Sequence, residues 1–79
     1  MSDTNKLESY LYDTIALLKI EARKAKLNAD DELSNSSYNN GYLMAYHTVI
    51  SLMKNQATVF NIDEEKIGLA EIEPERDLL

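Results

Sequence analysis

The sequence predicts a small all-α protein, a two-helix antiparallel hairpin at about residues 5–27 and 35–60 with a short helical or extended C-terminal tail. Apolar residues recur in steps of three and four along both segments, which is the period of an amphipathic helix. Polar residues that favour helix ends separate the two segments. A chain of 79 residues forms one domain at most, so we expect a single domain over 1–79: a hairpin over 1–62 and an acidic docking tail over 63–79.

The charge and composition of the chain argue against several classes of function, among them nucleic-acid and membrane binding. Residues 63–79 hold seven acidic and two basic residues, so they account for −5 of the net charge of −6. Such a chain is a poor candidate for binding nucleic acid or an anionic membrane. It has no cysteine, no signal-peptide pattern and no apolar run of the roughly 18 residues that a membrane span needs. We therefore expect a soluble, cytoplasmic protein without disulfides.

The first helix, over residues 5–27, has one apolar stripe. Asn5 with Glu8 resembles a capping box, and Lys24 and Lys26 suit the negative end of the helix dipole. The opposite side carries most of the charged residues, including Lys19, and is expected to face solvent. The stripe consists of Leu7, Leu11, Leu18, Ala22 and Ala25, flanked by Tyr10, Thr14, Ile15 and Leu17.

The second helix, over residues 35–60, follows a loop at 28–33 and is expected to be capped by Ser34, with a start at Asp31 as the alternative. Its apolar arc covers roughly 200°, about twice the stripe of an ordinary surface helix. The centre of the arc is Tyr38, Tyr42, Tyr46, Val49, Met53, Ala57 and Phe60, and its shoulders are Leu43 and Ile50 on one side and Ala45, Leu52 and Val59 on the other.

One partner helix cannot cover so wide an arc. We therefore expect a homodimer that closes a four-helix bundle, and a tetramer built as a dimer of dimers is the larger alternative. A monomer whose tail covers the whole arc is the other alternative. The predicted self-association residues are Tyr38, Gly41, Tyr42, Ala45, Tyr46, Val49, Leu52, Met53 and Phe60.

Gly41 follows two asparagines, a combination that usually marks a turn. However, Tyr38 before it is in helical phase with Tyr42 after it, so we place Gly41 inside the helix. A glycine there costs about 1 kcal/mol relative to alanine. Close approach of another helix at Gly41 and Ala45 would explain why the cost is tolerated. The alternative is that residues 39–41 fray the first turn.

The tail after Phe60 is expected to dock on the helices. Asp63 begins one helical turn that Gly68 closes, and Pro74 suits the first position of a final short helix. The basic residues of the first helix are candidates to receive the acidic tail, either of the same chain or of a partner. The candidate tail contacts are Lys19, Arg23, Lys24, Ile67, Leu69, Ile72 and Leu78, with Leu79 as a further apolar anchor.

The search for catalytic chemistry yields no catalytic, cofactor-binding or metal-binding residues. His47 lies on the polar side of the second helix, where we expect it to face solvent. The Glu-x-x-His pair of carboxylate-bridged metal bundles is absent, because Met44 stands where the glutamate would be. Ser34, Ser36 and Ser37 are better explained as helix caps than as nucleophiles.

The stretch GYLMAYHTVISLMKNQATVFNI, followed by IGL and PERDLL, resembles a family of short, uncharacterised bacterial helical-hairpin proteins. The resemblance covers residues 41–79 and depends on Gly41, Ala45, the run 49–53, the pair at 56–57 and the closing Asp77-Leu78-Leu79. It implies a discrete helical unit in a bacterial protein and brings no activity, substrate or cofactor.

These observations favour a non-enzymatic helical protein that self-associates and acts through protein–protein contacts, with itself and another protein as candidate partners. The wide apolar arc is the main reason. The alternative is an acidic inhibitor or decoy, phage-related or toxin-neutralising, that binds a basic partner through residues 63–79. The concentration of negative charge in that tail is its basis.

Overall fold

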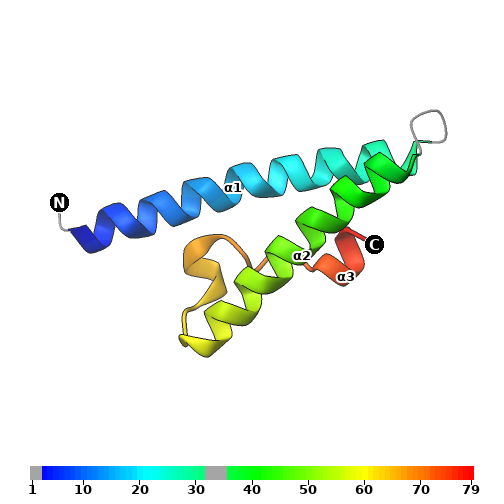
Figure 1. Ribbon diagram of the computed structural model, residues 1–79. Coiled ribbons are helices and arrows are strands. Elements are labelled where there is room, and N and C mark those ends of the chain that lie inside the picture. Colours follow the sequence, from blue (N-terminus) through cyan, green and yellow to red (C-terminus); the bar gives the residue numbers. More distant parts are fainter. Residues whose placement is uncertain (1–2, 32–35) are drawn as a thin grey trace.

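The computed structural model describes residues 3–31 and 36–79, and these ranges contain helices and no strand (Figure 1). Two long helices, α1 (Asp3–Asp30) and α2 (Ser37–Val59), precede a tail with the 3-10 turn η1 (Glu64–Ile67) and the short helix α3 (Pro74–Asp77). The predicted all-α class, with two long helices and a short tail, is confirmed.

The ends of the long helices differ from the prediction. Helix α1 continues to Asp30, so the predicted loop over 28–33 is wrong for its first three residues. Helix α2 begins at Ser37, because the side chain of Ser36 accepts a hydrogen bond from the amide of Asn39 at 3.1 Å. Asp31 is outside both helices, and the predicted cap Ser34 lies outside the described residues.

Helix α2 ends in a Schellman motif. Asn61 adopts a positive φ of 56°, its amide donates to the Thr58 carbonyl, and the amide of Ile62 donates to the Ala57 carbonyl at 2.8 Å. These bonds satisfy carbonyl groups that the helix end would otherwise leave without a partner. They also turn the chain back toward α1, where the tail begins.

The local structure of the tail agrees with its sequence. Asp63 caps η1 by accepting from the amide of Glu65 at 3.0 Å, and Gly68 closes the turn with a φ of 80°. Pro74 begins α3, where its fixed φ suits the first turn of a helix and its missing N–H costs nothing. The predicted roles of these three residues are confirmed.

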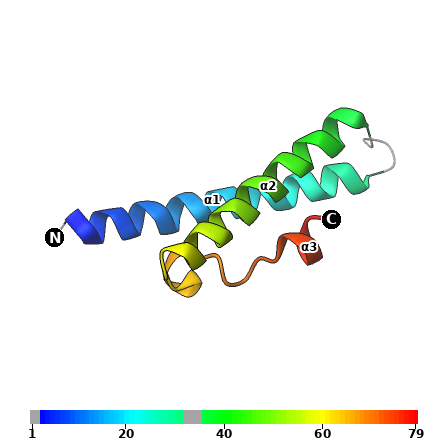
Figure 2. The same cartoon turned by 60° about the horizontal axis from the view of Figure 1, so that its bottom comes forward.

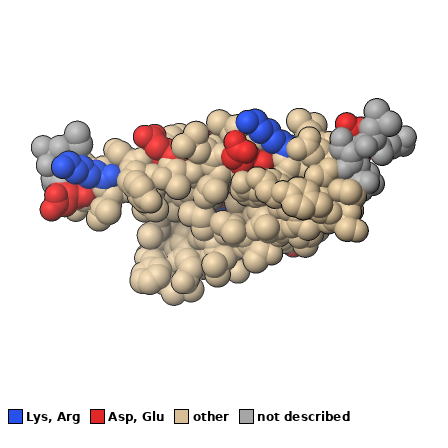
Figure 3. Space-filling view, turned by 45° about the horizontal axis from the view of Figure 1, so that its top comes forward, with Lys and Arg blue, Asp and Glu red and all other residues tan. Residues whose placement is uncertain are grey.

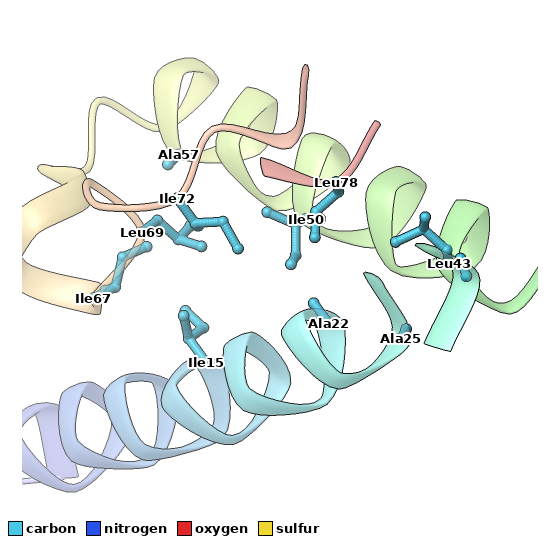
Figure 4. Close-up of a cluster of buried hydrophobic side chains, with 11 residues drawn as sticks. Ile15, Ala22, Ala25, Leu43, Ile50, Ala57, Ile67, Leu69, Ile72 and Leu78 are labelled. Carbon is cyan, nitrogen blue, oxygen red and sulfur yellow. The ribbon is translucent and has the colours of Figure 1, made fainter. Parts of the chain in front are cut away.

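The two long helices run in roughly opposite directions and diverge, and the tail packs along one side of the pair (Figures 1 and 2). Near the loop, α1 contributes the small side chains of Ala22, Ala25 and Ala29, which allow α2 to come close. Farther from the loop, where the two helices have diverged, the side chain of Ile15 points toward the tail (Figure 4). The core therefore has three components instead of the two of a simple hairpin: α1 with Ile15, Ala22, Ala25 and Ala29, α2 with Leu43, Ile50 and Ala57, and the tail with Ile67, Leu69, Ile72 and Leu78.

The buried side of α1 is rotated from the predicted stripe. Lys19, which was expected in solvent, is only 9 % exposed, whereas Leu7 at the predicted stripe is 63 % exposed. The tail causes this rotation, because it packs on the side of α1 that carries Ile15 and Lys19. Of the predicted stripe, Ala22 and Ala25 are buried and Leu11 and Leu18 are partly buried.

The predicted centre of the apolar arc on α2 is likewise not the core of this chain. The core residues Leu43 and Ile50 come from one shoulder, and from the centre only Ala57 is fully buried. The side chains of Tyr46 and Met53 are partly buried against the core. The rest of the centre is exposed: Tyr38, Tyr42, Val49 and Phe60.

Gly41 lies inside α2, so its predicted helical position is confirmed. A Cβ atom built at Gly41 would meet nothing within 4 Å, and the residue is exposed. Within one chain no close approach needs this glycine. Its predicted role in packing against a second copy remains a prediction.

We expect Gly41→Ala to raise the free energy of unfolding by about 0.5–1 kcal/mol, because alanine is the better helix former and nothing obstructs its methyl group. Urea denaturation followed by circular dichroism at low protein concentration measures the change. A loss of stability would contradict this expectation and would indicate that another chain packs at Gly41.

Candidate interaction surface

Two apolar pockets lie along the groove between α1 and α2. One has a volume of about 240 Å³ and the other of about 230 Å³. The first is lined by Leu18, Tyr42, Ala45, Tyr46 and Val49. The second is lined by Leu11, Ile15, Leu52, Met53, Gln56, Ala57, Phe60, Ile62 and Ile67. No charged side chain lines either pocket.

This groove is on the side of α2 away from α3. His47 and Lys54 contact the tail from one side of α2, whereas Tyr42 and Val49 line the groove from the other. Figure 3 shows a broad uncharged surface over the body of the molecule, with charged side chains along one edge and at the ends. We call this surface the open face; it comprises the exposed apolar residues beside the groove, namely Leu7, Tyr10 and Leu17 of α1 and Tyr38, Tyr42, Ala45, Val49, Leu52 and Phe60 of α2.

Three tyrosines one helical turn apart form a ladder along the open face. The rings of Tyr38 and Tyr42 are stacked with centroids 6.0 Å apart, and those of Tyr42 and Tyr46 meet edge to face at 5.3 Å. A hydrogen bond with Tyr42, followed by burial, raises the pKa of the Tyr46 hydroxyl. Rigid aromatic side chains with a polar tip are the residues most enriched in protein interfaces.

The opposite side of the molecule is occupied by the tail, and Lys54 holds it. The Nζ atom donates hydrogen bonds to the carbonyls of Ile72 at 2.6 Å and Leu69 at 3.2 Å, and to the Glu73 carboxylate at 2.7 Å. It also pairs with Glu64 at 3.2 Å, while the lysine side chain is only 12 % exposed. Burial lowers the pKa of Lys54, but the hydrogen bonds with Glu73 and Glu64 raise it more, so the net shift is upward.

Helix α1 holds the tail at two further points. The Nζ atom of Lys19 pairs with Glu71 at 3.5 Å, and that of Lys26 donates to the Leu79 carbonyl oxygen at 2.6 Å. The sequence proposed Lys19, Arg23 and Lys24 as tail contacts. The structure places Lys19 against the tail, whereas Lys24 pairs with Glu21 of its own helix.

The last turn of the tail is held by its own charges. The Asp77 carboxylate accepts one hydrogen bond from the Arg76 guanidinium at 2.8 Å and another from the backbone amide of Glu73 at 2.9 Å. The hydrogen bond from Arg76, then that from Glu73, and to a smaller extent the charge of Arg23, hold the pKa of the Asp77 carboxyl well below its usual range. Arg23 therefore lies close enough to the tail for its charge to act on Asp77.

His47 does not face solvent, so that prediction is wrong. Its side chain is 14 % exposed, because α3 packs over it, and its Nε2 atom is 3.4 Å from the Glu75 carboxylate. The Nε2 atom is buried and makes no hydrogen bond of acceptable geometry with the described residues. The sequence could not reveal this contact, because Glu75 is far from His47 along the chain.

Lys54 is the residue that the sequence interpretation missed. A signal for it exists, since Lys54 is the only charged residue in α2 and the tail that follows carries seven acids. A lone cation on an otherwise uncharged helix indicates a specific partner more strongly than one of the many bases of α1.

Within the described ranges, no three histidine, aspartate or glutamate side chains gather closely enough to hold a metal ion. No helix in these ranges combines the length and hydropathy that a membrane crossing requires. Comparison with protein-family models, with curated proteins and with solved structures found no match to this chain.

Proposed function

We propose that this is a non-enzymatic helical protein that self-associates through its open face and acts through protein–protein contacts. The observation that carries the proposal is the pair of apolar pockets between α1 and α2, neither of which is lined by a charged side chain of the described residues. Large exposed apolar patches of this kind mark interaction sites in soluble proteins.

The size of the exposed surface supports a missing subunit. The accessible surface is 5644 Å², whereas a compact monomer of 9.0 kDa exposes about 4,850 Å². The excess, about 800 Å², is close to what each partner buries in an interface of standard size. The radius of gyration, 14.1 Å, likewise exceeds the roughly 11.6 Å of a compact chain of this length.

The thickness of the molecule points the same way. Its extents are 48 × 23 × 17 Å, and the smallest accommodates two packed layers, the α1–α2 layer and the tail, whose axes lie about 8–10 Å apart. Stable domains bury the apolar face of each layer against another layer. On one side of α1 and α2 the tail is that layer, and on the other side none of the residues in 3–31 and 36–79 forms one.

A second copy of this chain is the occupant that we favour for the open face. Neither apolar pocket is lined by a charged side chain of the described residues, and the two charged residues beside Tyr38 and Tyr42, Glu21 and Lys24, have opposite signs. Two copies can therefore meet at the pockets without bringing like charges together there, despite the net charge of −6. A twofold pair of this kind contributes two long helices from each copy and closes a four-helix arrangement.

The acidic-decoy alternative has less support. The tail carboxylates that would attract a basic partner already have partners in the same chain: Lys54 pairs with Glu64 and Glu73, and Lys19 with Glu71. A basic partner would have to displace these two lysines, both of which are largely buried. We therefore place the function on the open face.

Substitution of Val49, in the wall of one pocket, tests the proposal. We expect Val49→Glu to raise the dimer dissociation constant by about 100-fold or more, because an unpaired charge buried in an interface costs about 3–5 kcal/mol. Sedimentation equilibrium measures this constant directly and is independent of molecular shape.

Thr58→Glu is the matched control. Thr58 is also β-branched and exposed, and nine helix positions, or two and a half turns, place it on the side of α2 opposite Val49. We expect the control to associate as the wild type does. Equal weakening by both substitutions, or by neither, would contradict the placement of the interface on the open face.

A further inference from the structure

Helix α1 carries an exposed stripe beside the groove, and no other element that the structure describes covers it. Leu7, Tyr10, Thr14 and Leu17 follow one another in steps of three and four residues, so they share one side of the helix. Leu7 is 63 %, Tyr10 66 % and Leu17 64 % exposed. The N-terminal part of α1 also extends past the rest of the molecule (Figures 1 and 2).

The stripe belongs to the same surface as the pockets. Leu11 and Leu18, which each follow a stripe residue directly, line the two pockets of the groove. Ile15 and Lys19, which contact the core and the tail, lie on the far side of Leu11 and Leu18 around the helix. The stripe is therefore part of the open face and is turned away from the tail.

We propose that the two copies pack with α1 antiparallel to α1 of the partner, so that Leu7 of one copy lies beside Leu17 of the other. This inference rests on the proposed self-association and adds its geometry. The occupant of the α1 stripe is then the same stripe of a second copy. The twofold axis crosses α1 between Tyr10 and Thr14, and α2 lies over α2 of the partner.

Charge favours this orientation over the parallel one. At its N-terminal end the stripe continues into Asp3 and Lys6, and at its C-terminal end it continues into Glu21 and Lys24. A parallel pair would place each of these four residues beside its own copy, and like charges would meet at every level. In the antiparallel pair Asp3 comes level with Glu21 of the partner, but Lys6 lies within one helical turn of the same Glu21, so two unlike contacts offset the two like ones. The two helix dipoles also oppose.

A charge exchange within the stripe distinguishes the two orientations. We expect Leu7→Lys and Leu17→Glu each to raise the dimer dissociation constant at least tenfold, because each places an unmatched charge at two symmetric contacts. The double variant should bind at least tenfold tighter than either single variant, since lysine then meets glutamate twice. In a parallel pair the double variant would instead bind more weakly than both, and that result would overturn the proposal.

Cross-linking provides a second readout without added charge. The chain has no cysteine, so Leu7→Cys with Leu17→Cys introduces the only two thiols. Ten residues of helix separate these positions by about 15 Å, which no disulfide within one chain can span. Mild oxidation should therefore give a dimer whose peptides join position 7 to position 17. Links of 7 to 7 and 17 to 17 alone would contradict the antiparallel arrangement.

The outcomes separate this inference from the proposed function. A wild-type chain that stays monomeric refutes both. A wild-type dimer that Val49→Glu dissociates, but that is unaffected by Leu7→Lys and Leu17→Glu, leaves the proposed function standing and refutes the α1 pairing. Ile20→Glu is the control on α1, because Ile20 is 49 % exposed but lies outside the stripe; it should leave the dissociation constant unchanged.

Discussion

Replacing Lys54 with methionine is expected to lower the free energy of unfolding by about 3 kcal/mol, because it breaks a largely buried ion pair and leaves the remaining charges uncompensated. Methionine keeps most of the aliphatic stem, so the packing of the side chain changes little. The Leu69 and Ile72 carbonyls lose their donor, and the Glu64 and Glu73 carboxylates face each other without a cation. Urea denaturation gives the loss, and amide exchange at residues 69–73 should show that the tail loosens first.

Lys24→Met is the matched control for Lys54. Lys24 is also paired, with Glu21 at 3.4 Å, but its side chain is 65 % exposed. Exposed pairs of this kind contribute about 0–1 kcal/mol, so the control should change stability by less than 1 kcal/mol. Equal losses for the two variants would show that Lys54 does not hold the tail.

Truncating Ile72 is expected to have a comparable effect through packing. Ile72 is completely buried between the tail and the two long helices, and Ile→Ala at such positions costs about 2–5 kcal/mol. Thermal unfolding should show a lower midpoint. Because the domain is small and its core has three components, we expect one cooperative transition with no stable two-helix remnant.

Leu79→Ala controls for the loss of side-chain carbons. It removes the same number of carbon atoms from the tail, yet the Leu79 side chain is 55 % exposed. The hydrogen bond from Lys26 goes to the Leu79 backbone, so it survives the substitution. We expect a loss below about 1 kcal/mol. If Ile72→Ala is as mild as this control, the tail is not part of the core.

Local signals in the sequence predicted local structure well. The roles of Asp63, Gly68 and Pro74 each follow from the backbone conformation that one residue type favours, and the structure has all three. The start of α2 was harder, because three neighbouring serines are equally good caps and the structure uses Ser36. Where several residues can cap a helix equally well, the packing of the helix against the rest of the protein decides which of them is used.

The sequence predicted which residues are apolar but not what covers them. Periodicity placed Val49 and Tyr42 at the centre of the α2 arc, and that centre is exposed because the tail covers the opposite shoulder. The burial of Lys19 escaped prediction for the same reason, since its partner Glu71 comes from the tail. The residues of the candidate interaction surface could therefore be predicted from the sequence. Which apolar residues belong to this surface and which belong to the core could be seen only in the structure.

Two sides of the α1–α2 layer thus have different roles in this account. The tail side is internal to the chain and is held by apolar anchors and lysines, with Lys54 at its centre. The open face carries the tyrosine ladder and two apolar pockets, and no segment of the described part of the chain covers it. Self-association through the open face is the central claim.

Sedimentation equilibrium of the wild-type chain over a range of concentrations measures self-association without assumptions about shape. We expect a reversible rise from the monomer mass of 9.0 kDa to twice that value. A mass that stays at 9.0 kDa up to the highest concentration reached would contradict self-association.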